Sequence, residues 1–123
     1  MHHSRLRGFI IDCETDDLPA AAAFWRETFG DARARKPQGK YVKLDPQAGL
    51  HVEVQMVRHP SRVHFDIASD DIPAEVARLE RLGAKVVKAL KNWTVMEAPT
   101  GHRFCVIRAR GEEFAATANA WTD

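Results

Sequence analysis

Acidic, histidine and amide side chains recur at alternate positions in short apolar segments of this 123-residue chain. In residues 50–57 the polar side chains of His51, Glu53 and Gln55 alternate with leucine, valine and methionine. Successive residues of a β-strand point to opposite faces of a sheet, so this pattern predicts one apolar and one polar face. Carboxylate, imidazole and amide groups on a stiff strand can bind a polar ligand or exchange protons with it.

Two further segments carry polar side chains in the same alternating pattern. Asp12 lies within the strand-like stretch 9–13, and His64 and Asp66 lie within 63–67. The candidate catalytic groups are three carboxylates, those of Asp12, Asp66 and Glu53. The candidate ligand contacts on these and neighbouring segments are His51, Gln55, His64, Trp93, Arg103 and Cys105, with Tyr41 as a further aromatic wall.

An internal repeat relates the two halves of the chain. Residues 11–20 (IDCETDDLPA) match residues 65–74 (FDIASDDIPA) without a gap, and five of the ten positions are identical. Asp12 and Asp66 are equivalent in this alignment. The repeat indicates a duplicated module, which narrows the architectures that the chain can adopt.

Each copy has the pattern of a strand, a helix and three further strands. The first copy covers about 7–58 and the second about 62–108. Asp17 and Asp71 are suitable N-caps, and each is followed two residues later by a proline that the first helical turn tolerates. The predicted helices are 18–29 and 72–82, and the predicted strands are 9–13, 32–35, 41–44 and 50–57 in the first copy and 63–67, 85–88, 93–97 and 103–108 in the second.

The residues after the second copy form a separate short segment. Residues 112–122 contain Phe114 and Trp121 and predict a short helix or an arm. Because exposed aromatic rings are unfavourable in water, we expect this segment to dock on its own subunit or on a partner. All of these elements fit one domain over residues 1–123.

The repeat gives Asp12 and Asp66 two alternative interpretations. If both carboxylates are buried near each other, their like charges raise the pKa of one of them, and the pair can act as a general acid and base. Alternatively, each carboxylate pairs with a nearby basic side chain such as Arg103, Arg62 or Lys43. The second interpretation is the simpler one.

Composition and charge narrow the function classes. Eighteen basic and seventeen acidic residues leave a net charge of +1, which does not support a nucleic-acid partner. No apolar run approaches the roughly 20 residues of a membrane span, and the first residues lack the apolar stretch of a signal peptide. We expect a cytoplasmic protein without a membrane partner. Cys13 and Cys105 have opposite strand parity, so no internal disulfide is expected.

Several further segments accompany the repeat. They are Phe24-Trp25 and Phe29-Gly30 after the first strand, and Arg62 to Ile67, Leu82-Gly83-Ala84 and Pro99 to Val106 in the second copy. With the duplicated order of elements, they resemble the superfamily of glyoxalases, bleomycin-resistance proteins and extradiol dioxygenases (the vicinal oxygen chelate superfamily), and within it the glyoxalase-like branch. The resemblance covers residues 7–108. It implies an α+β fold in which two tandem βαβββ modules form a curled mixed sheet around a cavity, with the helices on the outer face. It also implies a homodimer.

The resemblance further implies a divalent-metal site made by the first and last strands of each module. His64 matches the second-module histidine, whereas Ile10 stands at the equivalent first-module position and cannot bind a metal. Glu53 or Gln55 matches the ligand on the last strand of the first module, and Cys105 stands where the family has a glutamate. We interpret the metal site as degenerate and expect no cofactor. If zinc, nickel, iron or manganese binds, His64 and Glu53 are its candidate ligands.

The sequence favours a glyoxalase-like protein whose cavity binds or sequesters a small organic molecule. The alternative is a metal-dependent lyase, isomerase or dioxygenase of the same superfamily, so whether the protein is an enzyme stays open. A third hypothesis is a protein that acts mainly by association through Phe114 and Trp121. One architecture hosts several chemistries, and the fold alone does not choose among them.

Overall fold

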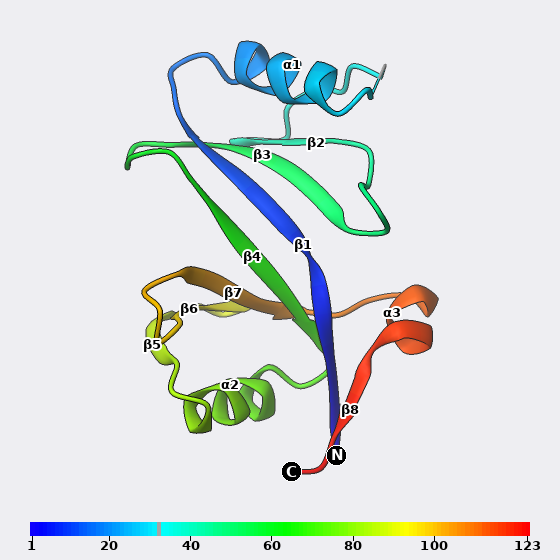
Figure 1. Ribbon diagram of the computed structural model, residues 1–123, viewed down its shortest axis with the longest axis vertical. Coiled ribbons are helices and arrows are strands. Elements are labelled where there is room, and N and C mark those ends of the chain that lie inside the picture. The colour runs from blue at the N-terminus through cyan, green and yellow to red at the C-terminus, as the bar shows by residue number, and fades with distance from the viewer. Residues whose placement is uncertain (32) are drawn as a thin grey trace. The chain divides into compact units, whose positions relative to one another are not determined.

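A computed structural model of the chain describes residues 1–31 and 33–123. Over these residues, eight strands and three helices make the mixed α+β fold that the sequence predicted (Figure 1). The elements are β1 His2–Glu14, α1 Leu18–Thr28, β2 Tyr41–Lys43, β3 His51–Val57, β4 Arg62–Ser69, α2 Ile72–Arg81, β5 Lys85–Ala89, β6 Trp93–Glu97, β7 Arg103–Arg108, α3 Glu112–Thr117 and β8 Asn119–Trp121. No helix in the described part of the chain has the length and apolar composition that crossing a membrane requires.

The chain divides into two compact units. One consists of residues 8–64, and the other consists of residues 1–7 together with residues 65–123. In the first unit, β3 pairs in parallel with β1 and antiparallel with β2. In the second unit, β7 pairs in parallel with β4 and antiparallel with β6, and β6 pairs with β5. Each unit therefore contains both kinds of strand pair.

The core of the unit 8–64 lies between α1 and one face of its sheet. The apolar side chains that alternate along β1 and β3 point toward α1, as the period of two predicted. The buried core consists of Ile11, Leu18, Ala22, Val42, Leu44, Val52 and Val54. Cys13 packs against this core, and burial raises the pKa of its thiol, so Cys13 serves as a small core side chain.

The two longer helices begin at the predicted caps. The Asp17 carboxylate accepts a hydrogen bond from the backbone N–H of Ala20 at 3.1 Å. The Asp71 carboxylate accepts the equivalent bond from Ala74 at 3.0 Å. Each bond satisfies one of the N–H groups that the first helical turn leaves without a partner. The repeat in the sequence is thus a repeat of strand, cap and helix.

The helix of the second unit covers its sheet less completely than α1 covers the first. An apolar groove of about 450 Å³ lies between α2, Leu6 in the first half of β1 and the strands β4 and β7. Leu82 on its rim is 65% exposed. In the first copy Trp25 and Phe29 extend the packing of α1, whereas the repeat places Leu79 and Leu82 at corresponding positions of α2. Smaller side chains therefore leave this interface open.

One strand predicted in the first copy is not formed. Residue 32 lies outside the described residues, and 33–35 are not in strand conformation. The Asp31 carboxylate accepts hydrogen bonds from the backbone N–H groups of Arg33 and Asp45 at 2.9 and 2.8 Å. Such side-chain bonds compete with the backbone pairing of a strand. Over the described residues the first copy is therefore βαββ, and the second is βαβββ.

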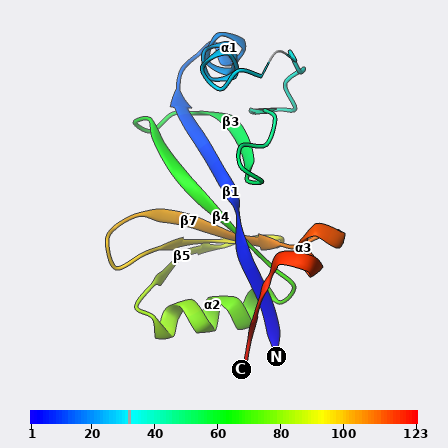
Figure 2. The same cartoon turned by 45° about the vertical axis from the view of Figure 1, so that its right-hand side comes forward.

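The first strand starts at His2 rather than at the predicted residue 9. Its first residues lack an apolar alternation, but they pair antiparallel with β8, from His2 opposite Trp121 to Ser4 opposite Asn119. The predicted C-terminal arm is thus a helix followed by a strand that docks on its own chain (Figure 1 and Figure 2). The sequence predicted that the segment with Trp121 docks on its own subunit or on a partner, and in the structure it docks on its own chain.

Candidate functional site

Polar side chains share the face of the β1–β3–β2 sheet that lies opposite the α1 core. In the strand register Asp12 lies beside Gln55, and Gln55 lies beside Tyr41. These three residues form a row across the sheet, and the Gln55 amide donates a hydrogen bond to the Tyr41 hydroxyl at 3.0 Å. Tyr41 is 39% exposed, so its ring is accessible from solvent.

A second row lies next to the first on the same face. Ile10, Glu53 and Lys43 are register neighbours across β1, β3 and β2. The Glu53 carboxylate accepts a hydrogen bond from His51 Nε2 at 2.7 Å. The sequence pattern therefore placed His51, Glu53 and Gln55 on the correct face, and it left their partners undefined.

Asp12 is the most distinctive group of this face because its carboxylate is buried, with the residue only 2% exposed. Its Oδ2 accepts a hydrogen bond from His64 Nδ1 at 2.6 Å, and Arg62 Nε lies 3.9 Å from the same oxygen. No group among the described residues forms a hydrogen bond with Oδ1. A buried acceptor without a partner costs about 1–3 kcal/mol. Oδ1 is therefore a buried acceptor that none of the described donors satisfies.

The second unit has a polar face of its own on β4, β6 and β7. Asp66 pairs with Cys105 in the register, and Cys105 pairs with Val95 of β6. Arg103 and Trp93 lie two residues from Cys105 and Val95 on these strands, so they are on the same side of the sheet. Arg103 Nε donates a hydrogen bond to Glu97 Oε1 at 3.3 Å. Trp93 is 41% exposed. The ligand contacts predicted in the second copy thus share one sheet face.

The two equivalent aspartates have basic neighbours of their own. Asp12 has His64 and Arg62, as described above, and Arg7 Nη1 lies 3.6 Å from Asp66 Oδ2. Of the basic side chains that the simpler interpretation named, Arg62 lies near Asp12, and Arg7, which it did not name, lies near Asp66. Arg7 was missed because the predicted first strand began after it. Extending the strand toward the N-terminus would have found it.

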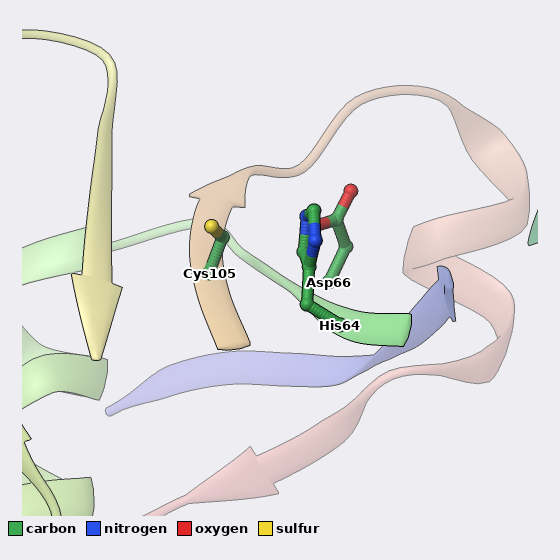
Figure 3. Close-up of side chains that lie close together, drawn as sticks. All are labelled: His64, Asp66 and Cys105. Carbon is green, nitrogen blue, oxygen red and sulfur yellow. The ribbon is translucent and has the colours of Figure 1, made fainter. Parts of the chain in front are cut away.

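Three residues on β4 and β7 form a candidate metal site. His64 and Asp66 are two residues apart on one strand and so lie on the same side of it, and Cys105 is the β7 partner of Asp66. One potential ligand atom from each residue lies within 4.8 Å of the others (Figure 3). An imidazole nitrogen, a carboxylate oxygen and a thiolate sulfur are all ligands that Zn²⁺ accepts. Glu53, the predicted companion of His64, is not in this group.

The chain was compared with known protein families and solved structures. A family model described as a glyoxalase-like domain matches residues 8–107. A structure titled as an NAD-dependent benzaldehyde dehydrogenase from Legionella pneumophila is 8% identical, with a TM-score of 0.60, over 83% of this chain and 99% of that one. No curated protein is a significant match.

Two further solved structures have a similar fold. A glyoxalase/bleomycin resistance protein/dioxygenase superfamily member from Vibrio splendidus 12B01 is 16% identical, with a TM-score of 0.54, over 86% of this chain and 99% of that one. An uncharacterized protein from Methanosarcina mazei is 12% identical, with a TM-score of 0.52, over 86% of this chain and 94% of that one. At these identities the likeness concerns the fold alone. The family model, which spans most of the residues, shows that this chain belongs to the glyoxalase-like domain family.

Proposed function

We propose that this protein binds a small organic molecule on the polar face of β1, β2 and β3, with Asp12 as the anchor. The observation that supports this proposal is the buried Oδ1 of Asp12, which has no hydrogen-bond partner among the described residues. A ligand that presents an N–H or O–H group would satisfy this oxygen. The row from Asp12 through Gln55 to the exposed ring of Tyr41 offers further polar and aromatic contacts to the body of such a ligand.

The expected ligand is a compact molecule with a hydroxyl, amide or amine group. A hydrogen bond to a charged group contributes about 1.5–3 kcal/mol, which corresponds to an affinity change of about 10- to 150-fold. In this function the protein sequesters or carries the molecule, and no covalent step is required.

A ligand screen with a matched pair of variants tests this proposal. Metabolites and antibiotics that raise the melting temperature would be titrated calorimetrically against the wild-type protein and against Asp12→Asn. The control is Asp70→Asn, because the exposed Asp70 carboxylate also accepts a hydrogen bond from a histidine, His3 Nδ1, at 2.7 Å. We expect Asp12→Asn to weaken binding by about tenfold or more, and Asp70→Asn to leave it unchanged. Equal affinities in all three proteins, or a screen without hits, would contradict the proposal.

The second candidate function is a metal-assisted lyase, isomerase or dioxygenase. It is favoured by the cluster of His64, Asp66 and Cys105, whose donor atoms suit zinc. The bond from His64 Nδ1 to Asp12 also fits, because carboxylates commonly orient histidines that bind metals. A bound ion would supply Lewis-acid polarisation of a substrate oxygen. In that function Asp12, Asp66 and Glu53 would be the candidate proton-transfer groups.

One residue leads us to prefer binding over metal-assisted catalysis. Ile10 stands where the family resemblance implies a first-strand metal ligand, and it is 3% exposed and has no donor atom. Three donors instead of four leave the family arrangement incomplete. Our preference for binding over catalysis therefore depends on Ile10, whose side chain cannot bind a metal.

Zinc titration separates the two candidates. Protein treated with a chelator and then dialysed would be titrated with zinc and assayed by calorimetry and metal analysis. Stoichiometric zinc that is lost in His64→Ala and Cys105→Ala, but kept in a control His59→Ala, would overturn our preference for the metal-free function. His59 is a suitable control because it lies in the loop before β4, and its ring bonds only to the neighbouring Pro60 carbonyl among the hydrogen bonds described.

We further propose that the protein is a cytoplasmic homodimer in which residues 1–123 form one domain. The exposed apolar residues around the α2 groove, among them Leu6, Phe65 and Leu82, support self-association. Light scattering coupled to size-exclusion chromatography would give twice the monomer mass. A monomer at micromolar concentration would contradict this part of the proposal.

A further inference from the structure

His2 is buried more completely than the other histidines and lies between two carboxylates. Its side chain is 1% exposed, and its Nε2 lies 2.8 Å from Glu75 Oε1. Its Nδ1 forms a hydrogen bond with Asp123 Oδ1. An ionised carboxylate only accepts hydrogen bonds, so both ring nitrogens must donate, and only the protonated imidazolium carries two N–H groups. The geometry therefore requires a positively charged, buried His2.

Charged groups from every neighbouring element complete this cluster. Arg78 on α2 donates two hydrogen bonds to the fully buried Glu75 carboxylate, at 2.8 and 2.9 Å. The α-amino group of Met1 lies 3.1 Å from the Asp123 carboxylate. With His2 protonated, the two carboxylates face three positive charges. Loss of the His2 proton removes the charge that lies between the carboxylates.

The cluster holds the C-terminal segment in place. Trp121 Nε1 donates a hydrogen bond to Ser4 Oγ at 2.8 Å, and the Arg78 guanidinium lies 3.8 Å from the centroid of the Trp121 ring. β8 runs beside the first residues of β1 in both views (Figure 1 and Figure 2). A three-residue strand pair is weak by itself, so the segment also depends on these side-chain contacts and on the hydrogen bond that Arg5 Nη1 donates to Thr117 Oγ1 at 2.6 Å.

We propose that His2 is a proton-dependent latch that fastens residues 112–123 to β1 and α2 when protonated and releases them when it loses its proton. A neutral imidazole has a single N–H, so it can donate to only one of Glu75 and Asp123. The other carboxylate would then face a nitrogen lone pair in a buried place, which is unfavourable. Release would uncover Trp121 and the backbone edge of β1 at His2–Ser4.

The direction of the pH effect follows from the groups in the cluster. Burial lowers the pKa of His2, but the hydrogen bonds and charges of Glu75 and Asp123 together raise it by more. The pKa of His2 therefore lies above its usual value. Burial raises the pKa of Glu75, but the contacts with Arg78, His2 and Ser4 together lower it by more. The pKa of Glu75 therefore lies below its usual value. The latch is therefore closed between these two values. It opens as the pH rises through the raised pKa of His2, and in acid when the carboxylates are protonated.

Hydrogen exchange in the full chain tests the latch. Backbone exchange in residues 112–123 would be measured by mass spectrometry from about pH 5 to pH 9.5 and corrected for the intrinsic pH dependence of exchange. We expect protection of this segment in neutral solution and a loss of about tenfold per pH unit above the midpoint, because one proton controls the closed state. The midpoint should lie above 6.5, the ordinary pKa of histidine. Residues 93–108 serve as the internal reference and should keep their protection.

Two variants complete the test. His2→Gln should leave the segment unprotected at all pH values, whereas His59→Gln, at a histidine in the loop between β3 and β4, should keep the wild-type profile. If His2→Gln does not fold, Asp123→Asn removes one of the two carboxylates and should shift the midpoint downward. A flat profile in the wild-type protein, or a wild-type midpoint in either His2→Gln or Asp123→Asn, would overturn the proposal.

Discussion

Asp31 shows how one buried carboxylate organises a loop. Its side chain is fully buried and accepts hydrogen bonds from the backbone N–H groups of Arg33 and Asp45 and from Arg35 Nη1 at 2.9 Å. Burial raises the pKa of Asp31, but the hydrogen bonds from these donors together lower it by more. The pKa of Asp31 therefore lies far below its usual value. The loop that replaces the predicted strand at 33–35 thus depends on an ionised side chain.

Removal of this carboxylate should destabilise the fold strongly. We expect Asp31→Ala to lower the free energy of unfolding by about 3 kcal/mol at pH 7, because several buried donors lose their acceptor. Urea denaturation measures this difference. Since the folded pKa is depressed, the contribution is present above the unfolded pKa of aspartate and disappears as the pH falls through the folded value. The difference between the two proteins should therefore shrink in acid.

Asp16→Ala is the control for this measurement because Asp16 is exposed and belongs to the same half of the chain. Its effect should stay within about 0.5 kcal/mol. An Asp31→Ala protein that loses less than about 1 kcal/mol would show that the loop does not depend on the Asp31 carboxylate.

At the scale of the elements, Gly8 determines how closely β1 and β3 approach each other. A Cβ atom at Gly8 would lie 1.8 Å from the carbonyl oxygen of His51 and 2.7 Å from its nitrogen. Both neighbours are backbone atoms of the partner strand, so no side chain can move aside. Glycine inside a strand commonly marks such a close approach.

Gly8→Ala should therefore disrupt the parallel pairing of β1 with β3. We expect a loss of about 3 kcal/mol or more in the free energy of unfolding, with part of the protein insoluble on expression. Chemical denaturation and solubility measure the effect. Gly49→Asn is the matched control, because Gly49 has a φ of 78° with open space around its Cα, and asparagine tolerates this backbone conformation. Similar stability of the two variants would show that the strands can separate without cost.

The helices illustrate a second effect at this scale. α1 and α2 have the same cap and the same proline, yet the core beside α1 is closed and the groove beside α2 is open. The side chain that α2 buries fully is a carboxylate, that of Glu75. This residue faces His2 and the C-terminal segment, so part of α2 packs against polar groups and not against its sheet. The same cap and proline therefore start both helices, but the two helices pack differently against their surroundings.

At the scale of the whole molecule, the duplicated module predicts that equivalent substitutions have equal effects. Asp17→Ala and Asp71→Ala each remove one N-cap hydrogen bond and should each cost about 1 kcal/mol. The two caps share no partner, so the double variant should lose about 2 kcal/mol. Thermal and urea denaturation of the four proteins would measure these values.

The same experiment examines the proposed single domain. One cooperative transition in all four proteins, with additive losses, agrees with residues 1–123 unfolding as one domain. Two separate transitions, each sensitive to only one of Asp17→Ala and Asp71→Ala, would contradict it.

Local patterns in the sequence were sufficient for much of this architecture. The strand faces of 9–13 and 50–57, the caps at Asp17 and Asp71 and the two longer helices follow from the alternation of side chains and from donors within one turn. These features depend on residues that are close in the sequence, where the geometry of the backbone fixes which side chains meet. The family resemblance rested on the order of these same features.

Contacts between distant parts of the sequence were decided only by the tertiary structure. The choice of Asp12 as the partner of His64 joins residues 52 positions apart, and the bond of His2 to Glu75 joins residues 73 positions apart. A polar side chain on a strand has many acceptable partners, and burial decides which one must satisfy it. For this reason the sequence could name the polar groups of the chain, whereas the unpartnered oxygen of Asp12 and the charge on His2 depend on the folded arrangement.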